Sequence, residues 1–383
     1  MSQNCKLIVV TLMTPQGETG VQTHFNAILD EAAKSGIKTQ LITPHISNLT
    51  IFRKAAGLIG KILRPLSKEW LTLWFRWVQY SLLIYQLKQL LQNEEDNIVI
   101  YAQDPLSSKA ALATKKNRHR VVTVVHFNIS EADEVLTKGL TVENGRLYRQ
   151  FQSNEAKILP KVDKIIFVSR FMQTIVNDRL PSLQSVPHTV IANFIQDSSN
   201  TRNKPKLQGD LICIGTLEKR KNQAFILRVL AKAHDRGYHY RLTIIGNGPD
   251  RSMLEKLTDE LGLNDSVTFL GLQANAAEYM TGHRIYVHAA LMENLPITLL
   301  EALCHGLPIL APAVGGIPEV FSDGQQGYFW PLDDLDAATD KLCEILENNN
   351  LHAQFSAQAR DRFVENFSEN RLAHKWLEEL TNA

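Results

Sequence analysis

The sequence predicts an α/β fold made of two Rossmann-like domains, each with a doubly wound parallel sheet. Short apolar runs rich in Val and Ile recur along the chain, helix-length segments separate them, and the pattern restarts after residue 205. Strands of a parallel sheet are covered on both faces, so they form continuous apolar runs. A chain of 383 residues is long enough for two such domains, each with its own core.

Two sets of strands are expected. The first set comprises residues 7–12, 39–42, 98–101, 121–125, 164–168 and 189–191. The second comprises residues 211–214, 241–245, 267–270, 285–288 and 309–311. The polar stretch between them has nothing to bury and is typical of a linker.

The domain boundaries follow from this pattern. We expect an N-terminal domain over residues 1–195, a linker over 196–207 and a C-terminal domain over 208–365. The tail, 366–383, carries an apolar helical face that needs a surface to cover, and we expect it to pack back on the first domain. That face consists of Phe367, Leu372, Trp376 and Leu380.

Composition restricts the partners and the compartment. Lys and Arg total 41 against 40 Asp and Glu, so the protein as a whole has no positive electrostatic field that would attract nucleic acid. The four cysteines lack CxxC spacing and indicate free thiols in a reducing cytosol. The apolar start has no cleavage site, and no run reaches the roughly 18 apolar residues that span a bilayer. We expect a cytoplasmic protein without a signal peptide.

The first candidate binding segment is the loop from Thr14 to Val21, which follows the first strand and precedes a helix-like segment. Gly20 near its end would let backbone amides approach a phosphate at the helix N-terminus, where the dipole favours negative charge. The spacing is not the dinucleotide GxGxxG pattern. An ordinary strand-to-helix turn is the alternative.

The second candidate follows the first strand of the second set, at Gly215 and Thr216, and continues into Lys219, Arg220 and Lys221. Arg binds a phosphate bidentately and Lys binds it as a point charge, so these cations would neutralise a pyrophosphate. Ligands of open α/β sheets bind at the carboxyl ends of strands, where this loop lies. The alternative is a solvated charge run.

The third candidate is the pair Glu293 and Glu301, separated by seven residues. Glu301 lies in a helix rich in Ala and Leu, where an unpaired carboxylate would be costly. The vicinal hydroxyls of a ribose or hexose would supply donors in pairs. An ion pair within the helix is the alternative.

With this Glu-x7-Glu spacing the chain resembles the retaining GT-B glycosyltransferases of family 4, the large bacterial family also called glycosyl transferases group 1. Further segments match the family pattern, more loosely in the first half. They are Gly246–Pro249, Val267–Gly271, Gly306–Pro308, Gly315–Glu319 and Asp323–Gly327, with Gly20–Val21, Ile98–Gln103, Val124–His126 and Phe167–Arg170. The resemblance covers nearly the whole chain. It implies two domains that face each other across a cleft.

The resemblance also implies residue roles. Glu301 would bind the ribose hydroxyls, Glu293 the transferred sugar, and Lys221 with Arg220 the diphosphate. His126, at a strand end, would touch the sugar near the reacting centre, although a lone His is otherwise usually structural. The remaining donor-binding positions are Gly20, Val21, Gly215, Thr216, Asn247, Asn294, Leu295, Pro296, Ile297 and Thr298.

Three positions depart from the family pattern. Thr216 stands where the family often has Arg, and Arg220 beside Lys221 would compensate for it. Ala290 replaces a common Ser, and Asn294 replaces the commoner Gly. These differences leave the donor sugar open.

Asp334 and Asp336 form a DxD sequence, which in another glycosyltransferase architecture binds a metal. Here the pair follows Pro331 at a predicted helix start, where Asp caps backbone amides. We expect a cap, no metal site and no cofactor, because Lys and Arg supply the charge that a metal would bring.

The resemblance implies a metal-independent retaining hexosyltransferase. The donor would be a uridine or guanosine diphosphate sugar, and the acceptor a glycan or lipid-linked molecule of cell-envelope polysaccharide or glycolipid synthesis. A nucleotide-sugar epimerase of the same architecture and a non-catalytic nucleotide-sugar-binding protein are the alternatives.

Residues 51–90 are the least expected segment. They hold seven Lys and Arg, one acidic residue, Glu69, and many aromatic residues, of which Trp70, Trp74 and Trp77 share a helix face. A basic aromatic amphipathic helix lies readily in an anionic membrane interface. We expect peripheral contact with the inner face of the plasma membrane. A helix that covers the sheet is the alternative.

Overall fold

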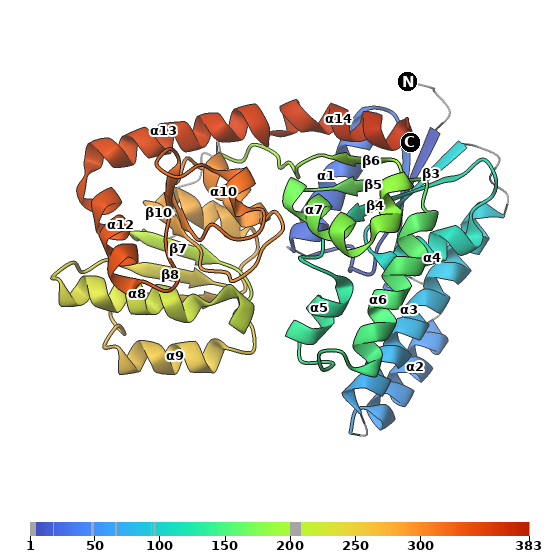
Figure 1. Cartoon of the computed structure of the whole chain (residues 1–383), viewed down its shortest axis with the longest axis horizontal. Helices are drawn as coiled ribbons and strands as arrows, with labels where there is room; N and C mark the ends of the chain where they lie inside the picture. Colours follow the sequence, from blue (N-terminus) through green and yellow to red (C-terminus); the bar gives the residue numbers. More distant parts are fainter. Residues whose placement is uncertain are drawn as a thin grey trace. The chain divides into compact units, whose positions relative to one another are not determined.

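The computed structural model describes residues 5–17, 19–46, 50–65, 67–92, 94, 97–199 and 208–382, and for residues 50–53 the backbone only. The chain divides into two compact units (Figure 1), Met1–Ala192 with Ala373–Ala383 and Asn193–Leu372. Most of the predicted linker, residues 200–207, lies outside the described residues. Its described start belongs to the second unit, where Asp197 pairs with Arg360.

The first unit contains a six-stranded parallel sheet in the order β2-β1-β3-β4-β5-β6. Its strands are β1 (Cys5–Val10), β2 (Lys38–Ile42), β3 (Asn97–Ala102), β4 (Arg120–Val125), β5 (Lys164–Phe167) and β6 (His188–Val190). Its α-helices are α1 (Gly20–Lys34), α2 (Thr50–Leu63), α3 (Lys68–Leu91), α4 (Pro105–Thr114), α5 (Glu131–Thr137), α6 (Arg146–Ile158) and α7 (Arg170–Arg179). Short 3₁₀ turns cover Leu159–Lys161 and Pro181–Ser185.

Helix caps follow three successive strands of this sheet. The Asp104 side chain after β3 accepts from the amide of Ser107 at 2.8 Å, and the Ser169 hydroxyl after β5 accepts from the amide of Met172 at 3.1 Å. Ser130, in the loop that follows β4, caps α5 in the same way. Since a cap satisfies the first helical amides, each helix starts shortly after its strand. The carboxyl edge of the sheet therefore consists of short strand-to-helix loops.

The last helix, α14 (Glu369–Thr381), carries the chain back to the first unit. Trp376 is buried there and donates from Nε1 to the carbonyl of Ala192 at 2.9 Å. Glu379 pairs with Lys164 of β5 at 2.5 Å. The part of the apolar face at Trp376 and Leu380 is thus buried in the first unit, whereas Phe367 and Leu372 belong to the second unit.

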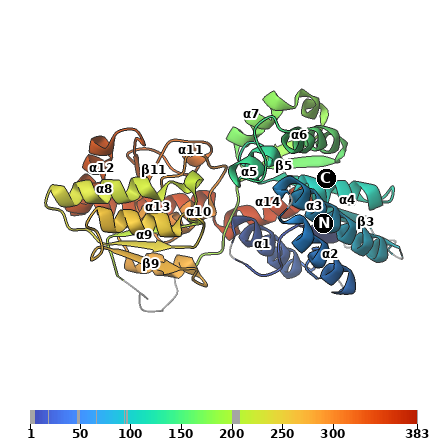
Figure 2. The same cartoon turned by 90° about the horizontal axis from the view of Figure 1, so that it is seen from below.

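The second unit contains a six-stranded parallel sheet in the order β12-β11-β10-β7-β8-β9. Its strands are β7 (Leu211–Ile214), β8 (Leu242–Ile245), β9 (Val267–Gly271), β10 (Ile285–Val287), β11 (Ile309–Ala311) and β12 (Gly327–Phe329). Its α-helices are α8 (Gln223–Asp235), α9 (Arg251–Glu260), α10 (Ile297–Cys304), α11 (Ile317–Val320), α12 (Leu335–Glu347) and α13 (Asn349–Asn366). Short 3₁₀ turns cover Lys219–Lys221 and Ala276–Gly282. Figure 2 shows the second unit from below, with helices α8 and α9 labelled beside strand β9.

The predicted α/β class with two parallel sheets is confirmed, and each predicted strand begins and ends within two residues of the observed one. The sequence missed β12, which is three residues long and begins at Gly327. Residues 51–90 belong to two helices, α2 and α3. Pro65 ends the first helix, and Ser67 caps α3 by accepting from the amide of Trp70 at 3.4 Å.

All four cysteines are free thiols, and Cys213 and Cys304 are buried. Within the described ranges, the helices are all too short or too polar to cross a bilayer.

Candidate functional site

The loops after β7, β8, β10 and β11 meet at the carboxyl edge of the second sheet. The first strand of this unit, β7, lies between β8 and β10, so the strand order reverses beside it. Ligands of doubly wound sheets bind where the order reverses, because the two neighbouring loops leave in opposite directions. Most of the predicted donor-binding residues lie in these loops.

The three cations after β7 do not share one environment. They form a 3₁₀ turn, Lys219–Lys221, which ends at Asn222 in the left-handed conformation with φ of 52°. The side chains of Arg220 and Lys221 reach Glu293, whereas Lys219 is exposed. The structure therefore selects two of the three cations for the site.

Glu293 is the centre of this cluster and is buried. Its Oε1 accepts from Lys221 Nζ and lies 3.3 Å from both Arg220 Nη1 and His288 Nε2. Burial alone would raise the pKa of this carboxyl, but the charge of Lys221, the contact with His288 and the charge of Arg220 together hold the pKa below its ordinary value. Glu293 is therefore an anion at neutral pH.

His288, which follows β10, is a site residue that the sequence did not reveal. Burial lowers the pKa of its imidazole despite the nearby Glu293 carboxylate, and Lys221 and Arg220 act in the same direction as burial. Its backbone carbonyl accepts from Trp330 Nε1 at 2.9 Å. The sequence signal for His288 is a polar residue that directly follows an apolar strand, because such positions lie at the carboxyl edge of the sheet.

Arg220 is held at both ends of its guanidinium. Nη1 donates to the carbonyl of Met292 at 2.9 Å, and Nη2 donates to Glu218 Oε1 at 2.9 Å. The amide of Leu291 donates to the Arg220 carbonyl at 2.8 Å. These contacts join the loop after β7 to the loop after β10.

Glycines fix the backbone around Glu293. Gly315 has a φ of 58°, and a Cβ there would lie 1.9 Å from the carbonyl oxygen of Glu293. The amide of Gly316 donates to the same carbonyl at 3.0 Å. Only a glycine permits this approach, so the loop after β11 holds the Glu293 backbone in place.

The segment after Glu293 leads into α10. Asn294, Leu295 and Pro296 are buried, and Ile297 is the first helical residue. Glu301 lies farther along the same helix and is half-buried, as is Thr298. The N-terminus of α10 and its positive dipole end therefore lie next to the Glu293 cluster.

Two further predicted residues border the loop after β7. The side chain of Gln223 donates to the carbonyl of Thr216 at 2.9 Å. The carbonyl of Asn247 accepts from the amide of Leu217 at 3.1 Å. Asn247 is exposed, and its side-chain Oδ1 accepts from the amide of Gly248 at 2.9 Å.

His126 lies in the first unit, directly after β4. Its Nε2 is 3.1 Å from Gln103 Oε1, and its ring makes an edge contact with His24 at 4.8 Å between centroids. His24 in turn bonds to the hydroxyl of Tyr101 at 2.7 Å and contacts the ring of Trp376 at 4.7 Å. Burial lowers the pKa of His126 to about 3, so its imidazole is neutral at physiological pH.

Gly20 and Val21 also belong to the first unit, as the first two residues of α1. Thr19 caps this helix in a capping box with Gln22. The Gln22 side chain also donates to the carbonyls of Thr14 and Gln16, at 2.9 and 3.0 Å. The loop before α1 is therefore folded onto the helix, with Gly20 exposed at its start.

The DxD sequence is a helix cap, as predicted. Asp334 accepts from the amide of Ala337 at 3.0 Å at the start of α12. Asp336 pairs with Lys232 at 2.6 Å and with Arg236 at 2.7 Å.

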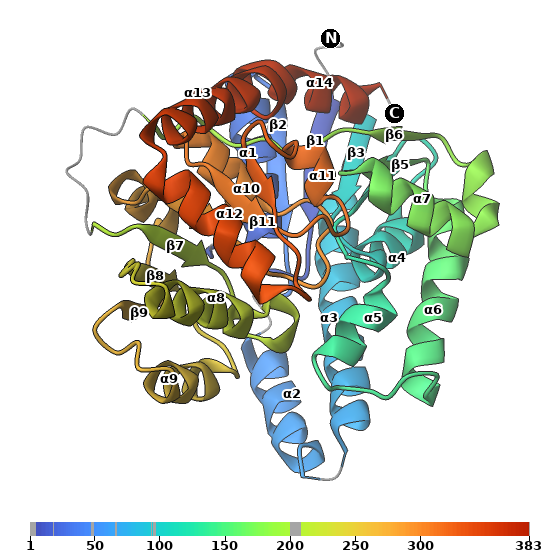
Figure 3. The ribbon, with the colours of Figure 1, turned by 60° about the vertical axis from the view of Figure 1, so that its left-hand side comes forward.

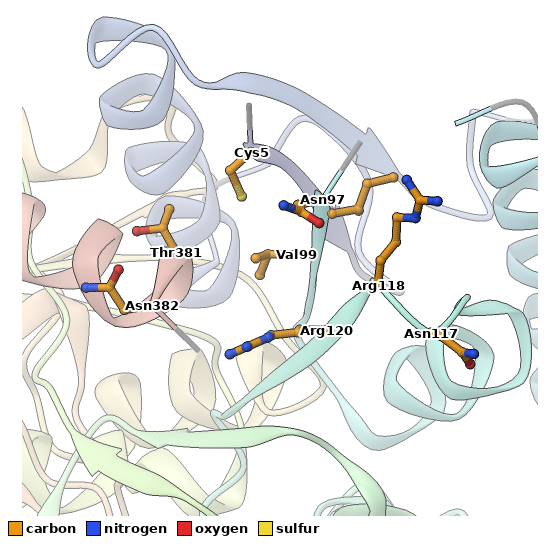
Figure 4. Close-up of a pocket in the computed structure, with 9 residues that line it drawn as sticks. Cys5, Asn97, Val99, Asn117, Arg118, Arg120, Thr381 and Asn382 are labelled. Atoms are coloured by element: carbon orange, nitrogen blue, oxygen red, sulfur yellow. The ribbon is translucent and has the colours of Figure 1, made fainter. Parts of the chain in front are cut away.

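A separate polar pocket lies at the opposite, amino-terminal edge of the first sheet (Figure 4). Cys5, Asn97 and Arg120, which begin β1, β3 and β4, line it together with Thr381 from the end of α14. None of the predicted site residues is among its lining residues.

Comparison with known proteins identifies two matching family models. The model described as Glycosyl transferases group 1 matches residues 194–362, and the model described as Glycosyltransferase Family 4 matches residues 19–199. The two matches correspond closely to the two units of the structure.

Among curated relatives, the N-acetyl-alpha-D-glucosaminyl L-malate synthase of Bacillus anthracis is 29% identical over 166 residues, which are 43% of each chain. The GDP-mannose-dependent alpha-(1-6)-phosphatidylinositol monomannoside mannosyltransferase of Mycolicibacterium smegmatis is 25% identical over 74% of this chain and 75% of its own. The Poly(ribitol-phosphate) alpha-N-acetylglucosaminyltransferase of Staphylococcus aureus is 22% identical over 78% of this chain. The match spans only 58% of that relative.

Solved structures with the same fold include the sucrose-phosphate synthase of Thermosynechococcus elongatus, with a TM-score of 0.76, 15% identity and 98% coverage of both chains. Anabaena HepE in complex with UDP-glucose has a TM-score of 0.70 at 15% identity, over 98% of this chain and 100% of its own. These similarities establish the GT-B architecture.

Proposed function

Since the chain belongs to the group 1 glycosyltransferases of family 4, we propose that it transfers a hexose-type sugar from a nucleoside diphosphate sugar to a glycan or lipid-linked acceptor. The observation that carries this proposal is the cluster of Lys221, Arg220, His288 and Glu293 where the strand order of the second sheet reverses. Two cations held at such a place suit a diphosphate.

Sugar transfer requires stabilisation of the leaving diphosphate. The bond between the anomeric carbon and the diphosphate oxygen breaks, and negative charge develops on the leaving group. Lys221 and Arg220 are already oriented by Glu293 and by the Met292 carbonyl, so they would stabilise this charge without reorganisation. We assign the same charge-stabilising role to the start of α1, at the exposed Gly20 and the half-buried Val21, and to the backbone at Gly215 and Thr216.

The acceptor oxygen would attack the anomeric carbon on the same face of the sugar from which the leaving group departs. A phosphate oxygen of the leaving diphosphate would take the acceptor proton, so that configuration is retained. His126 would hold a sugar hydroxyl as a neutral hydrogen-bonding group, consistent with its low pKa. No metal is needed in this mechanism, because side-chain cations carry the positive charge.

The remaining predicted residues would hold the nucleotide and the sugar. We assign the ribose hydroxyls to Glu301, with Thr298 and Asn247 bordering the nucleotide. The transferred sugar would contact Glu293 and the buried segment that precedes α10, Asn294, Leu295, Pro296 and Ile297.

The names of two relatives suggest the acceptor class. One name gives a phosphatidylinositol monomannoside as the acceptor, which is a glycolipid, and the other gives poly(ribitol-phosphate), which is a polymer. We propose that the enzyme acts in cell-envelope polysaccharide or glycolipid synthesis at the inner face of the plasma membrane. Residues 51–90 are the candidate membrane contact.

The proposal is tested by incubating the purified chain with a panel of UDP-, GDP- and ADP-sugars, with and without a crude lipid and glycan extract. We expect release of one nucleoside diphosphate, accelerated by the extract. Conversion of the donor sugar without nucleotide release would indicate an epimerase. If no donor is consumed, the chain is not a glycosyltransferase of this kind.

Replacing Glu301 with Ala is expected to raise the dissociation constant of the nucleoside diphosphate about 10- to 100-fold. The reason is that the net loss of one hydrogen bond to a charged group costs about 1.5–3 kcal/mol, and about 1.4 kcal/mol is a tenfold change in affinity. Isothermal titration calorimetry measures the change. Glu365→Ala on α13, an exposed residue, is the control and should bind as the unmodified chain does. Unchanged affinity in the Glu301 variant would remove this residue from the nucleotide site.

A further inference from the structure

Helices α2 and α3 form a hairpin that projects from the first sheet (Figure 3). The C-terminal half of α3 packs on the sheet through Leu83, Leu87 and Leu91. The projecting part is held by contacts between the two helices. Ala56 is buried against Val78 and Leu82, and its carbonyl accepts from Trp74 Nε1 at 3.0 Å.

Gly60 continues this inner face of α2, one turn after Ala56. A Cβ at Gly60 would lie 2.9 Å from the ring of Phe75, so the two helices touch closely there. The described part of the inner face of α2 therefore packs through the small residues Ala56 and Gly60 on larger apolar side chains of α3. The hairpin does not need the outer face of α2 for its own packing.

The outer face of α2 is nevertheless apolar. Leu58 and Ile62, one helical turn apart, are 63% and 62% exposed. Trp70, in the first turn of α3, is 63% exposed. Large apolar side chains grouped at the end of a projecting hairpin indicate a surface that meets a partner.

The charges around this apolar face are basic. Lys54 and Lys61 are exposed along one edge of it, and Arg64 and Lys68 are exposed near the turn between the helices. Glu69, the one acidic residue of the sequence from 51 to 90, accepts from the hydroxyl of Thr141 at 3.0 Å. The face thus combines apolar and positively charged groups.

We propose that this outer face, Leu58 and Ile62 with Lys54, Lys61 and Trp70, docks on an anionic lipid bilayer. A helix with this pattern lies in the plane of the interface, where its apolar side chains enter the acyl region and its lysines meet the phosphates. Trp70 suits the headgroup level. This docking specifies the membrane contact proposed above for residues 51–90 and rests on that part of the proposed function, but it does not depend on the donor chemistry.

A second copy of this chain is a poorer partner for the same face. A two-fold interface would bring identical patches together, with Lys54 and Lys61 of both copies close to one another. Such like-charge contacts oppose association. An anionic bilayer instead complements these charges.

The test is co-sedimentation of the full chain with vesicles of phosphatidylcholine, with and without phosphatidylglycerol. We expect binding to the anionic vesicles only. The double variant Leu58→Ser, Ile62→Ser should lose about tenfold or more of its binding, because two apolar side chains no longer enter the bilayer. Lys54→Glu with Lys61→Glu should lose a similar amount.

Met253→Ser on α9 removes an exposed apolar residue elsewhere and should bind as the unmodified chain does. Circular dichroism and donor-dependent nucleotide release without vesicles should be unchanged in all variants, which separates docking from folding and from donor chemistry. Equal binding of the Leu58 and Ile62 variant would overturn the proposal. The proposal would also be overturned if the unmodified chain stayed in the supernatant with anionic vesicles. A dimer that the Leu58 and Ile62 variant converts to a monomer would instead assign this face to a second copy of the chain.

Discussion

Replacing Lys221 with Met is expected to lower the turnover number for sugar transfer by about 10²- to 10³-fold, with a much smaller change in donor affinity. Lys221 is one of two cations that Glu293 orients at the edge of the second sheet. A charge that acts mainly on the developing diphosphate is lost from the transition state more than from the bound donor. Steady-state kinetics with saturating donor measure the effect.

The adjacent Lys219 offers a matched control. It has the same charge and belongs to the same 3₁₀ turn, but its side chain is exposed. Lys219→Met should therefore retain nearly full turnover. Equal losses of turnover in both variants would mean that the turn acts through its net charge. Unchanged turnover in the Lys221 variant would exclude Lys221 from catalysis.

Replacing Glu293 with Gln is expected to lower the free energy of unfolding by about 2–3 kcal/mol. Removing one partner of a fully buried pair costs about 3–5 kcal/mol, and the partial exposure of Lys221 and Arg220 reduces this cost. For a unit of this size the melting temperature should fall by about 4–12 °C. Differential scanning fluorimetry measures the shift.

The pH dependence identifies the cause. The folded-state pKa of Glu293 is below its ordinary value of 4.5, so the stability that its charge contributes is full above about pH 4.5 and is lost as the pH falls below it. The difference in melting temperature between the unmodified chain and the Gln variant should shrink between about pH 5 and pH 3. A constant difference would point to packing instead of charge.

Glu218→Gln is the control for this variant. Glu218 also pairs with Arg220, at 2.9 Å, but its side chain is 27% exposed. Its replacement should change the melting temperature by far less than the Glu293 replacement does, since exposed ion pairs contribute about 0–1 kcal/mol.

The sequence by itself determined the fold class and most strands. Runs such as Leu211–Ile214 are apolar on both faces because helices cover both sides of a parallel sheet, and this pattern is visible without coordinates. Positions within strand-to-helix loops were also predictable, because the carboxyl ends of parallel strands share one edge. This rule placed the loop that carries Lys221 at that edge, and the structure brings Glu293 to the same edge from 72 positions farther along the chain.

Only the tertiary structure decided which side chains meet there. The charge run alone does not distinguish Lys219, Arg220 and Lys221. The turn directs Arg220 and Lys221, to which the resemblance assigned the diphosphate, to Glu293 and leaves Lys219 exposed. His288 lies in the site because β10 pairs with β7. The strand order of the sheet determines that these two strands are neighbours, and the local sequence pattern does not show it. The division of residues 51–90 into a sheet-covering part and an exposed apolar face likewise arose from packing of Ala56 and Gly60 on α3. Local periodicity specifies elements, whereas contacts between distant elements depend on the global arrangement that buries them.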